Sequence, residues 1–380
     1  MQRAVTIFLG GFLLDSALSV ADTWLPISPL RNFVAWLVFA AAMLLGAISF
    51  FTPRLPKRFL WPPAGFLVWT AICGGFPLAF AAPGNAMPIL SGAQLVLAIA
   101  LLAWRLLTPP LPERPAFSWS NLAISLGVAI VMFPFVIVCA ALNGIGVAIE
   151  TSTSGYVKLR PTGLMLEERQ LEKDGHRVRL VSMMHIGEKN FYQSVLSSLP
   201  AQGAAIVLLE GVSDREGLIR GRFSYAKVAT LLGLTSQETS PLQHAGSTSQ
   251  SASNAAQPPR LEYRRADVDI STFQPLTIDF INTLGGVLAN PTFENAMRII
   301  RDPDSPFLQP GADKIVHRDI LENRNAHLLA EIDEALRTHD TVVVPWGALH
   351  LPGIEAALEA QGFRETGRID RPVVHWKRSQ

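Results

Sequence analysis

The sequence predicts two parts of different fold class: an all-α bundle of transmembrane helices over residues 1–150 and a layered α/β (α+β) domain over residues 151–380. Two observations support this division. Residues 1–150 are strongly apolar and hold only seven of the 32 Lys and Arg residues and four of the 31 Asp and Glu residues, so the second part has the charge density of a soluble domain. In that second part, strand-like apolar runs alternate with helical patterns, as in sheets covered by helices.

The first part contains about five apolar segments that are each long enough to cross a bilayer. The predicted spans are residues 4–21, 32–51, 60–82, 88–107 and 121–148. The first span starts like a signal peptide, but Asp15 interrupts its apolar run and no clean small-residue cleavage site precedes Asp22. We therefore expect a retained helix and a multi-pass integral membrane protein whose partner is the lipid bilayer.

Basic residues in the short loops predict the orientation of these spans. The loops after the second and fourth spans carry most of them, namely Arg54, Lys57, Arg58, Arg105 and Arg114. Only Arg31 follows the first span. Because Lys and Arg concentrate in cytoplasmic loops, we expect a cytoplasmic amino terminus and, after five spans, an extracytoplasmic soluble domain.

Composition and missing motifs exclude several functions. Asp15 is the one clear ionisable residue inside a span, which favours an anchor over a transporter. The second part is close to neutral, so nothing indicates nucleic-acid binding. The sequence contains no His-Glu-x-x-His, Gly-x-Ser-x-Gly, Walker or Cys-x-x-Cys motif, which disfavours serine hydrolysis, nucleotide hydrolysis and thiol redox chemistry.

The second part is predicted to begin with a hairpin, residues 156–169 and 177–183, which turns at Asp174-Gly175. Residues 236–260 are rich in Ser, Thr, Gln, Ala and Pro and predict a flexible insertion. The other expected elements are helices over 191–199, 272–289, 292–301, 313–337 and 351–361, strands over 204–209 and 341–344, and a terminal hairpin of 363–369 and 372–376.

Three polar motifs follow strand-like runs in this second part. They are Met184-His185-Ile186-Gly187-Glu188, Leu208-Leu209-Glu210-Gly211 and the segment from Gly347 through His350 to Gly353. The carboxyl ends of strands in an open α/β sheet meet at one edge, where ligands bind. His185, Glu188, Glu210 and His350 could therefore hold a divalent ion with an open position for water. Alternatively, each imidazole caps a helix or bonds within the core.

Further polar residues leave alternatives open. Glu210 at a sheet edge could be a metal ligand, a general base or a structural cap. Asp267 and Asp269 would share a strand face with Arg265, so that one of them pairs with this arginine or both reach a metal. Arg324 could lie on a solvated helix face or orient a carboxylate or an oxyanion through its planar fork.

At these residues the chain resembles the TraB, TIKI and GumN families, which are related to erythromycin esterase and ChaN-type domains. Ser182-Met183-Met184-His185 fits their Gly/Ser-x-x-His motif, with Ser in place of the commoner Gly. Leu209-Glu210-Gly211 is similar to their strand with a terminal Glu. Arg324-Asn325 is similar to their Arg-Asn pair in a long helix, and Gly347 to Gly353 matches their Gly-x-x-His-x-x-Gly. The resemblance covers residues 156–376 and leaves the membrane spans outside.

The resemblance implies a TIKI/ChaN-like fold with a polar cleft and metal-dependent proteolysis. The predicted function is thus a membrane-anchored, extracytoplasmic metal-dependent hydrolase acting on peptides or another small substrate. Its expected catalytic residues are His185, Glu210, His350 and Arg324, and its expected ligands for Mn, Co or Zn are His185, Glu188, Glu210, His350 and Asp267. Because a common fold does not determine activity, the alternative is a noncatalytic or regulatory membrane protein that holds a ligand such as haem in the same cleft.

Overall fold

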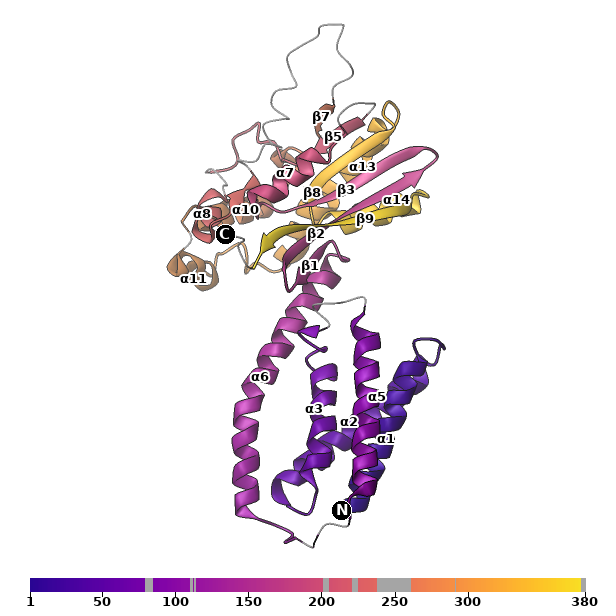
Figure 1. Ribbon diagram of the computed structural model, residues 1–380. Coiled ribbons are helices and arrows are strands. Elements are labelled where there is room, and N and C mark those ends of the chain that lie inside the picture. Colours follow the sequence, from indigo (N-terminus) through magenta and orange to yellow (C-terminus); the bar gives the residue numbers. More distant parts are fainter. Residues whose placement is uncertain are drawn as a thin grey trace. The chain divides into compact units, whose positions relative to one another are not determined.

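The computed structural model describes residues 1–78, 85–109, 112, 114–200, 205–220, 225–237, 261–290 and 292–376 (Figure 1). Most of the expected flexible insertion, residues 238–260, lies outside this part of the chain. The chain divides into two compact units, which we call unit 1 (Met1–Ala148) and unit 2 (Ile149–Gln380).

Unit 1 is helical. Its described helices are α1 (Gln2–Ala21), α2 (Ser28–Phe51), α3 (Lys57–Ala71), α5 (Ala86–Leu107) and most of α6 (Trp119–Ser152). Of these, α1, α2, α5 and α6 have 20, 24, 22 and 34 residues and are apolar enough to cross a membrane. Much of their apolar surface is exposed, as is typical of helices that face lipid. The structure therefore supports the expected membrane protein.

The third expected span, residues 60–82, differs from the structure. Helix α3 has only 15 residues and is followed by Gly74 and Gly75, whose φ angles of +58° and +71° interrupt a right-handed helix. Residues 79–84 lie outside the described residues. Within the described part of unit 1, four helices rather than five are thus long enough to span by themselves.

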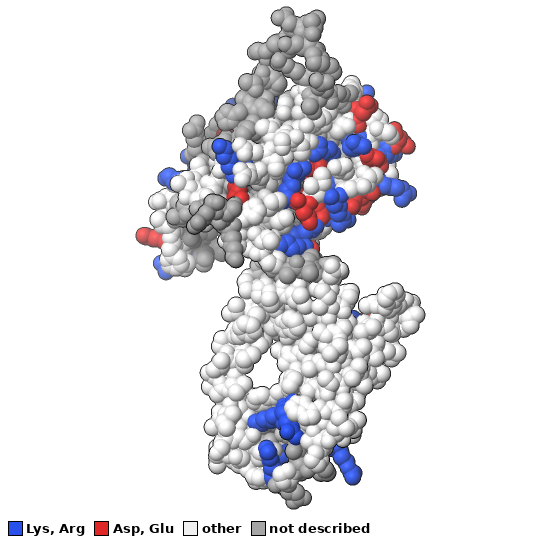
Figure 2. All heavy atoms as spheres, in the orientation of Figure 1, with Lys and Arg blue, Asp and Glu red and all other residues white. Residues whose placement is uncertain are grey.

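The chain direction nevertheless alternates through unit 1. Helices α1 and α5 are antiparallel, because Arg105 Nη2 donates to Gln2 Oε1 at 3.3 Å while Gln94 Nε2 donates to Asp15 Oδ2 at 2.7 Å. The start of α3 lies at the end of α5, where the Phe59 and Trp104 rings are 4.9 Å apart. Helix α6 begins at this same end and runs parallel to α3. Lys and Arg side chains gather at the end where α1 begins (Figure 2).

In its described residues, unit 2 contains a seven-stranded mixed sheet, which confirms an α/β domain after the helical region. Its strands are β1 (Val157–Arg160), β2 (Gly163–Lys173), β3 (His176–Met183), β5 (Ala205–Leu209), β7 (Glu262–Arg265), β8 (Thr341–Gly347) and β9 (Arg364–His375). The order is β1-β2-β3-β8-β5-β7, and β9 pairs with β2. Strands β3, β8, β5 and β7 are parallel, whereas β1, β2 and β9 pair in antiparallel fashion.

The two hairpin predictions had different outcomes. Strands β2 and β3 form the first hairpin, and Asp174 and Gly175 have the positive φ angles of 50° and 85° that a two-residue turn requires. The prediction of a terminal hairpin was wrong. Residues 364–375 form one strand, β9, which pairs along most of β2. Pro372 lies at a register shift in this pairing, so it marks an irregularity in a strand rather than a reversal of the chain.

Helices cover both faces of this sheet. Glu168 of β2 bonds to Arg179, whose Nη1 donates to the carbonyl of Ser198 at the end of α7 (Lys189–Ser197). The next residue, Arg169, donates instead to Glu355 of α14 (Leu351–Ala360) at 2.5 Å. Because successive strand residues point to opposite faces, α7 and α14 lie on opposite faces. Helix α13 (Arg324–Ala335) packs beside α14.

The remaining elements lie between the strands of unit 2 along the chain. They are β4 (Ile186–Gly187), α8 (Ala226–Leu232), β6 (Thr235–Ser236), η2 (Ile270–Thr272), α10 (Pro275–Ala289), α11 (Phe293–Arg301), α12 (Ala312–His317) and the π-helix η3 (Arg318–Asn323). Strands β4 and β6 form a separate two-stranded sheet. The expected single helix over 313–337 is therefore three successive pieces, with the π-helix directly before Arg324.

Candidate functional site

Four polar residues follow the carboxyl ends of the parallel strands. His185 comes after β3, Glu210 after β5, Asp267 after β7 and His350 after β8. The chain leaves β3 toward α7 and leaves β8 toward α14 on the opposite face, so the edge between these two strands is a topological switch point. Ligands of open α/β sheets bind at such points.

Arg324 connects three of these residues. Its Nη2 donates to Glu210 Oε1 at 2.9 Å and to Asp267 Oδ2 at 2.7 Å, and its Nε donates to Asp267 Oδ1 at 2.9 Å. Its Nη1 lies 3.1 Å from His350 Nε2. The guanidinium also lies 5.2 Å from the centre of the Trp346 ring. Only 9% of the Arg324 side chain is exposed, so it does not lie on a solvated helix face.

Backbone amides hold the two carboxylates in place. Gly347 N donates to Glu210 Oε2 at 2.7 Å, and Gly211 N donates to Asp267 Oδ2 at 2.9 Å. Burial opposes the charge of Arg324, but the hydrogen bonds to Asp267 and the charge of Glu210 together raise its pKa. We therefore interpret the cluster as a guanidinium cation held between two carboxylates.

Asp267 and Asp269 do not pair with Arg265 in the described structure. Asp267 binds Arg324, and its side chain is completely buried. Asp269 caps η2 by accepting from Ser271 N at 3.1 Å, and it also accepts from Ser213 Oγ at 2.6 Å. Strand β7 ends at Arg265, so the expected strand face does not continue to these aspartates.

His350 is held as a neutral imidazole. Its Nε2 faces the Arg324 guanidinium and must accept, so Nδ1 carries the proton and donates to Asn325 Oδ1 at 2.8 Å. Burial lowers the pKa of His350 to about 4, and the charge of Arg324 acts in the same direction. His350 therefore positions Arg324, and its Nε2 lone pair is not available to a metal ion in this arrangement.

This environment predicts an acid-sensitive fold. Because the pKa of His350 is about 4 when folded and 6.5 ordinarily, the unfolded state binds more protons between these values. The free energy of unfolding should therefore be about 3 kcal/mol higher above pH 6.5 than near pH 4, and this difference should be lost as pH falls from 6.5 toward 4. Hydrogen–deuterium exchange of β5 and β8 amides in the full chain measures it. A His350→Asn variant should show a flatter pH dependence in this range, and an unchanged slope would contradict the prediction.

His185 has a different environment. The imidazole is exposed, stacks on the Tyr225 ring with centroids 4.7 Å apart, and places Nδ1 3.2 Å from Gln237 Oε1. If Nδ1 donates to this oxygen, Nε2 keeps its lone pair. Neither Gln237 nor Tyr225 was among the predicted site residues. Gln237 falls within the expected flexible insertion. However, its backbone N–H donates to the carbonyl of His185 at 2.8 Å, beside the β4–β6 pair.

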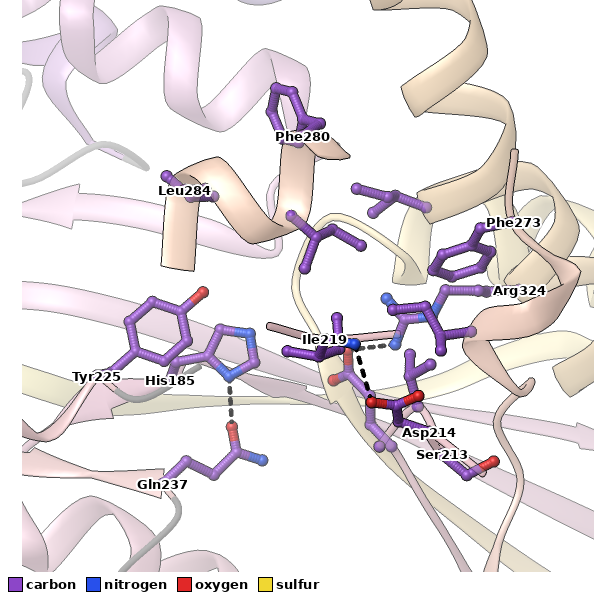
Figure 3. Close-up of a pocket in the computed structure, with 16 residues that line it drawn as sticks. His185, Ser213, Asp214, Ile219, Tyr225, Gln237, Phe273, Phe280, Leu284 and Arg324 are labelled. Atoms are coloured by element: carbon purple, nitrogen blue, oxygen red, sulfur yellow. Dashed lines mark hydrogen bonds and ion pairs between the residues drawn. The ribbon is translucent and has the colours of Figure 1, made fainter. Parts of the chain in front are cut away.

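His185, Glu210 and Arg324 line one cavity of about 400 Å³ (Figure 3). Ser213 and Asp214 add polar groups to its lining. The rest of the wall is largely apolar and includes Val212, Ile219, Ile270, Phe273, Phe280, Ile281, Leu284 and Ile320. In Figure 3, Phe280 and Leu284 on α10 lie across the cavity from the stacked His185 and Tyr225 rings. Phe280, Ile281 and Leu284 lie in a stretch that the sequence predicts only as an amphipathic helix, so the sequence alone did not identify them as cavity residues.

Glu188 is not part of this cluster. Its carboxylate accepts from His375 N at 2.7 Å and lies 2.8 Å from His375 Nδ1. It lines an adjacent cavity of about 570 Å³ that shares His185 and Tyr225 with the first. The structure thus brings four of the five predicted metal ligands to one sheet edge and places the fifth beside the carboxyl-terminal strand.

The donor atoms in this arrangement do not fit a metal centre with three or more protein ligands. Glu210, Asp267 and His350 all direct the lone pairs that could bind a metal at the Arg324 guanidinium. A metal ion shared by these residues would have to displace that cation. Among the described residues, no group of three or more His, Cys, Asp and Glu is arranged to hold a metal. We therefore assign no chemical step to a metal ion.

No protein-family model, curated protein or solved structure matches this chain. The resemblance to the TraB, TIKI and GumN families stays a prediction from the four motifs. What the geometry adds is that Glu210, Arg324 and His350, which come from three of these motifs, are in direct contact, and that His185 of the fourth lines the same cavity.

The two motif glycines predict a pair of contrasting variants. A Cβ on Gly353 would lie 2.7 Å from Asn325 Nδ2, whereas a Cβ on Gly347 would meet nothing nearer than 3.5 Å. Because the Asn325 amide bonds to both the carbonyl and Nδ1 of His350, Gly353→Ala should break these bonds as it displaces Asn325 and cost about 1–3 kcal/mol of stability. Gly347→Ala is the matched control and should change little. Hydrogen exchange of α13 and β8 measures both, and equal effects would contradict the steric argument.

Proposed function

We propose that unit 2 is a hydrolase domain, held at a membrane by unit 1, in which His185 activates the water that attacks a peptide or ester carbonyl. The observation that carries this proposal is the placement of His185 in the same cavity as the Glu210–Arg324 pair. The Gln237 contact at Nδ1 leaves Nε2 as the basic atom. Within the described residues, Nε2 has no hydrogen-bond partner that would compete with water.

The proposed reaction uses this base and one cation. His185 Nε2 takes a proton from water as the water oxygen bonds to the carbonyl carbon, and the carbonyl π electrons move to its oxygen. The protonated imidazole then returns the proton to the leaving nitrogen or oxygen as that bond breaks. Arg324 uses four of its five N–H hydrogens in the cluster, so one remains for the developing oxyanion. Glu210, Asp267 and His350 position Arg324.

The cavity wall supports a substrate with an apolar group next to the reacting carbonyl. Phe273, Phe280 and Leu284 would bury such a group and exclude water from it. Exclusion of water also strengthens the attraction between Arg324 and an oxyanion. Among the predicted substrates, we therefore favour peptides and esters with a bulky apolar substituent.

Hydrolysis assays on the purified full chain in detergent test this proposal. Peptide and ester libraries are incubated with the protein, with a chelator, and with added Mn, Co or Zn. We expect hydrolysis that favours apolar substituents and persists in the chelator. Activity that disappears in the chelator and returns with one metal would replace our water-activation step by the metal-dependent mechanism that the sequence predicted. Absence of hydrolysis in every condition would remove the proposal.

The competing function is noncatalytic binding of a flat apolar ligand such as haem. The observation in its favour is an apolar cavity with one exposed imidazole, His185, which could be an axial ligand. His350 could not supply the second ligand while its Nε2 accepts from Arg324. Absorbance spectra during haem titration distinguish the two functions. A ligation band that is lost in His185→Ala would favour binding over hydrolysis.

We also propose that the basic end of unit 1 faces the cytoplasm and that unit 2 is extracytoplasmic. The alternating chain direction supports this, because α6 starts at the basic end and leads into unit 2 from the other end. A reporter that is active only outside the cytoplasm, fused after Gln380, tests the orientation. A well-expressed but inactive fusion would reverse it.

A further inference from the structure

The basic end of unit 1 contains a pocket that the proposed hydrolase function does not use. It has a volume of about 210 Å³, and we call it the basic pocket. Its lining residues are Pro53, Leu55, Pro56, Lys57, Arg58, Arg114 and Asn121. Three of these seven residues are cationic.

Hydrogen bonds between distant segments build this pocket. Arg54 Nε donates to the carbonyl of Arg114 at 2.9 Å, which joins the loop after α2 to the segment before α6. Asn121 Nδ2 donates to the carbonyls of Ser49 and Phe50 at 3.1 and 2.7 Å. Lys57 Nζ donates to Ser125 Oγ at 2.5 Å. The pocket is therefore a formed feature of the helix ends rather than a set of independent surface side chains.

The charge of the pocket is not neutralised by the described residues. No described carboxylate forms an ion pair with Lys57, Arg58 or Arg114. Aromatic rings hold two of the cations in place, since Lys57 Nζ lies 5.0 Å from the Trp61 ring and Arg58 Cζ lies 5.4 Å from the Trp104 ring. Cations supported in this way keep hydrogen atoms free for an anionic ligand.

We propose that the basic pocket binds the phosphate headgroup of an anionic phospholipid. The pocket favours an anionic ligand, because three cations line it and no described carboxylate pairs with them. A lipid is favoured over free phosphate because the pocket lies at the ends of apolar helices, next to the tryptophans that typically occupy the membrane interface. Basic pockets between membrane helices on the cytoplasmic side bind such headgroups. This site is independent of the hydrolase proposal.

Native mass spectrometry of the full chain in detergent tests the site. Phosphatidylglycerol and phosphatidylcholine are titrated in parallel, and the retained lipid is counted. We expect preferential retention of phosphatidylglycerol. Each neutralised cation should weaken this retention about fivefold, which corresponds to about 1 kcal/mol per basic residue. The variants are the triple change Lys57→Gln, Arg58→Gln and Arg114→Gln, and Arg114→Gln alone, since Lys57 also holds Ser125.

The matched control is Arg3→Gln. Arg3 lies in the first turn of α1 at the same end of unit 1 but does not line the pocket, so its loss should leave lipid retention unchanged. Equal weakening by Arg3→Gln and Arg114→Gln would show diffuse attraction and overturn the proposal. Equal retention of both lipids would also overturn it. Displacement of phosphatidylglycerol by millimolar inorganic phosphate would identify a site for free anions instead of a lipid site.

Discussion

His185→Gln should lower kcat for peptide or ester hydrolysis by about 10²- to 10⁴-fold, the usual contribution of a positioned general base. Glutamine keeps a polar side chain of similar reach but has no basic nitrogen. Because His185 is exposed and contributes no buried bond, the folded state should be retained. Steady-state kinetics on the purified full chain, with circular dichroism to check folding, measure the effect.

A second exposed histidine provides the control for this experiment. His327 on α13 lies outside both cavities that His185 lines, so His327→Gln should keep the parental activity. If His185→Gln is folded and as active as His327→Gln, His185 is not the base. The proposed mechanism would then be wrong even if the protein hydrolyses the substrate.

Arg324→Met should have the largest effect on stability, about 3–5 kcal/mol, because it leaves two buried carboxylates without their cation. Asp267 is fully buried and Glu210 is 9% exposed, so water cannot replace the guanidinium at both. Arg324→Lys should destabilise less, since it keeps the charge but cannot bond to Glu210, Asp267 and His350 at once. Hydrogen exchange of β5 and β8 amides and thermal unfolding of the full chain measure both changes.

A compensating variant separates this charge effect from a simple packing defect. Adding Glu210→Gln and Asp267→Asn to Arg324→Met removes the uncompensated charges and should recover part of the lost stability. If the triple variant is less stable than Arg324→Met alone, the cost does not arise from buried charge. Our interpretation of Arg324 as the cation of this cluster would then fail.

Local sequence signals predicted much of the architecture. Long apolar runs predicted helices α1, α2, α5 and α6, and Asp174-Gly175 predicted the turn between β2 and β3. The strand preceding each polar motif was also expected. These predictions succeeded because periodicity and turn chemistry act over a few neighbouring residues.

The failures involve contacts between distant residues. Residues 364–375 form one strand because β2 offers a long pairing edge, which outweighs the local turn signal near Pro372. Arg265 does not pair with Asp267, because Arg324 reaches that carboxylate from another element. Gln237 was assigned to a flexible insertion because only its contact with His185 shows its place in the site.

By itself, the sequence determined that a membrane-spanning helical part precedes an α/β domain and that polar residues end several parallel strands. Only the tertiary structure decided which of their donor atoms remain available. Arg324 lies 114 residues from Glu210 and 57 from Asp267 along the chain, yet it bonds to both. Such pairings depend on distances in the folded state, which residue spacing does not encode. The structure therefore distinguishes the exposed imidazole of His185 from the buried, fully bonded imidazole of His350.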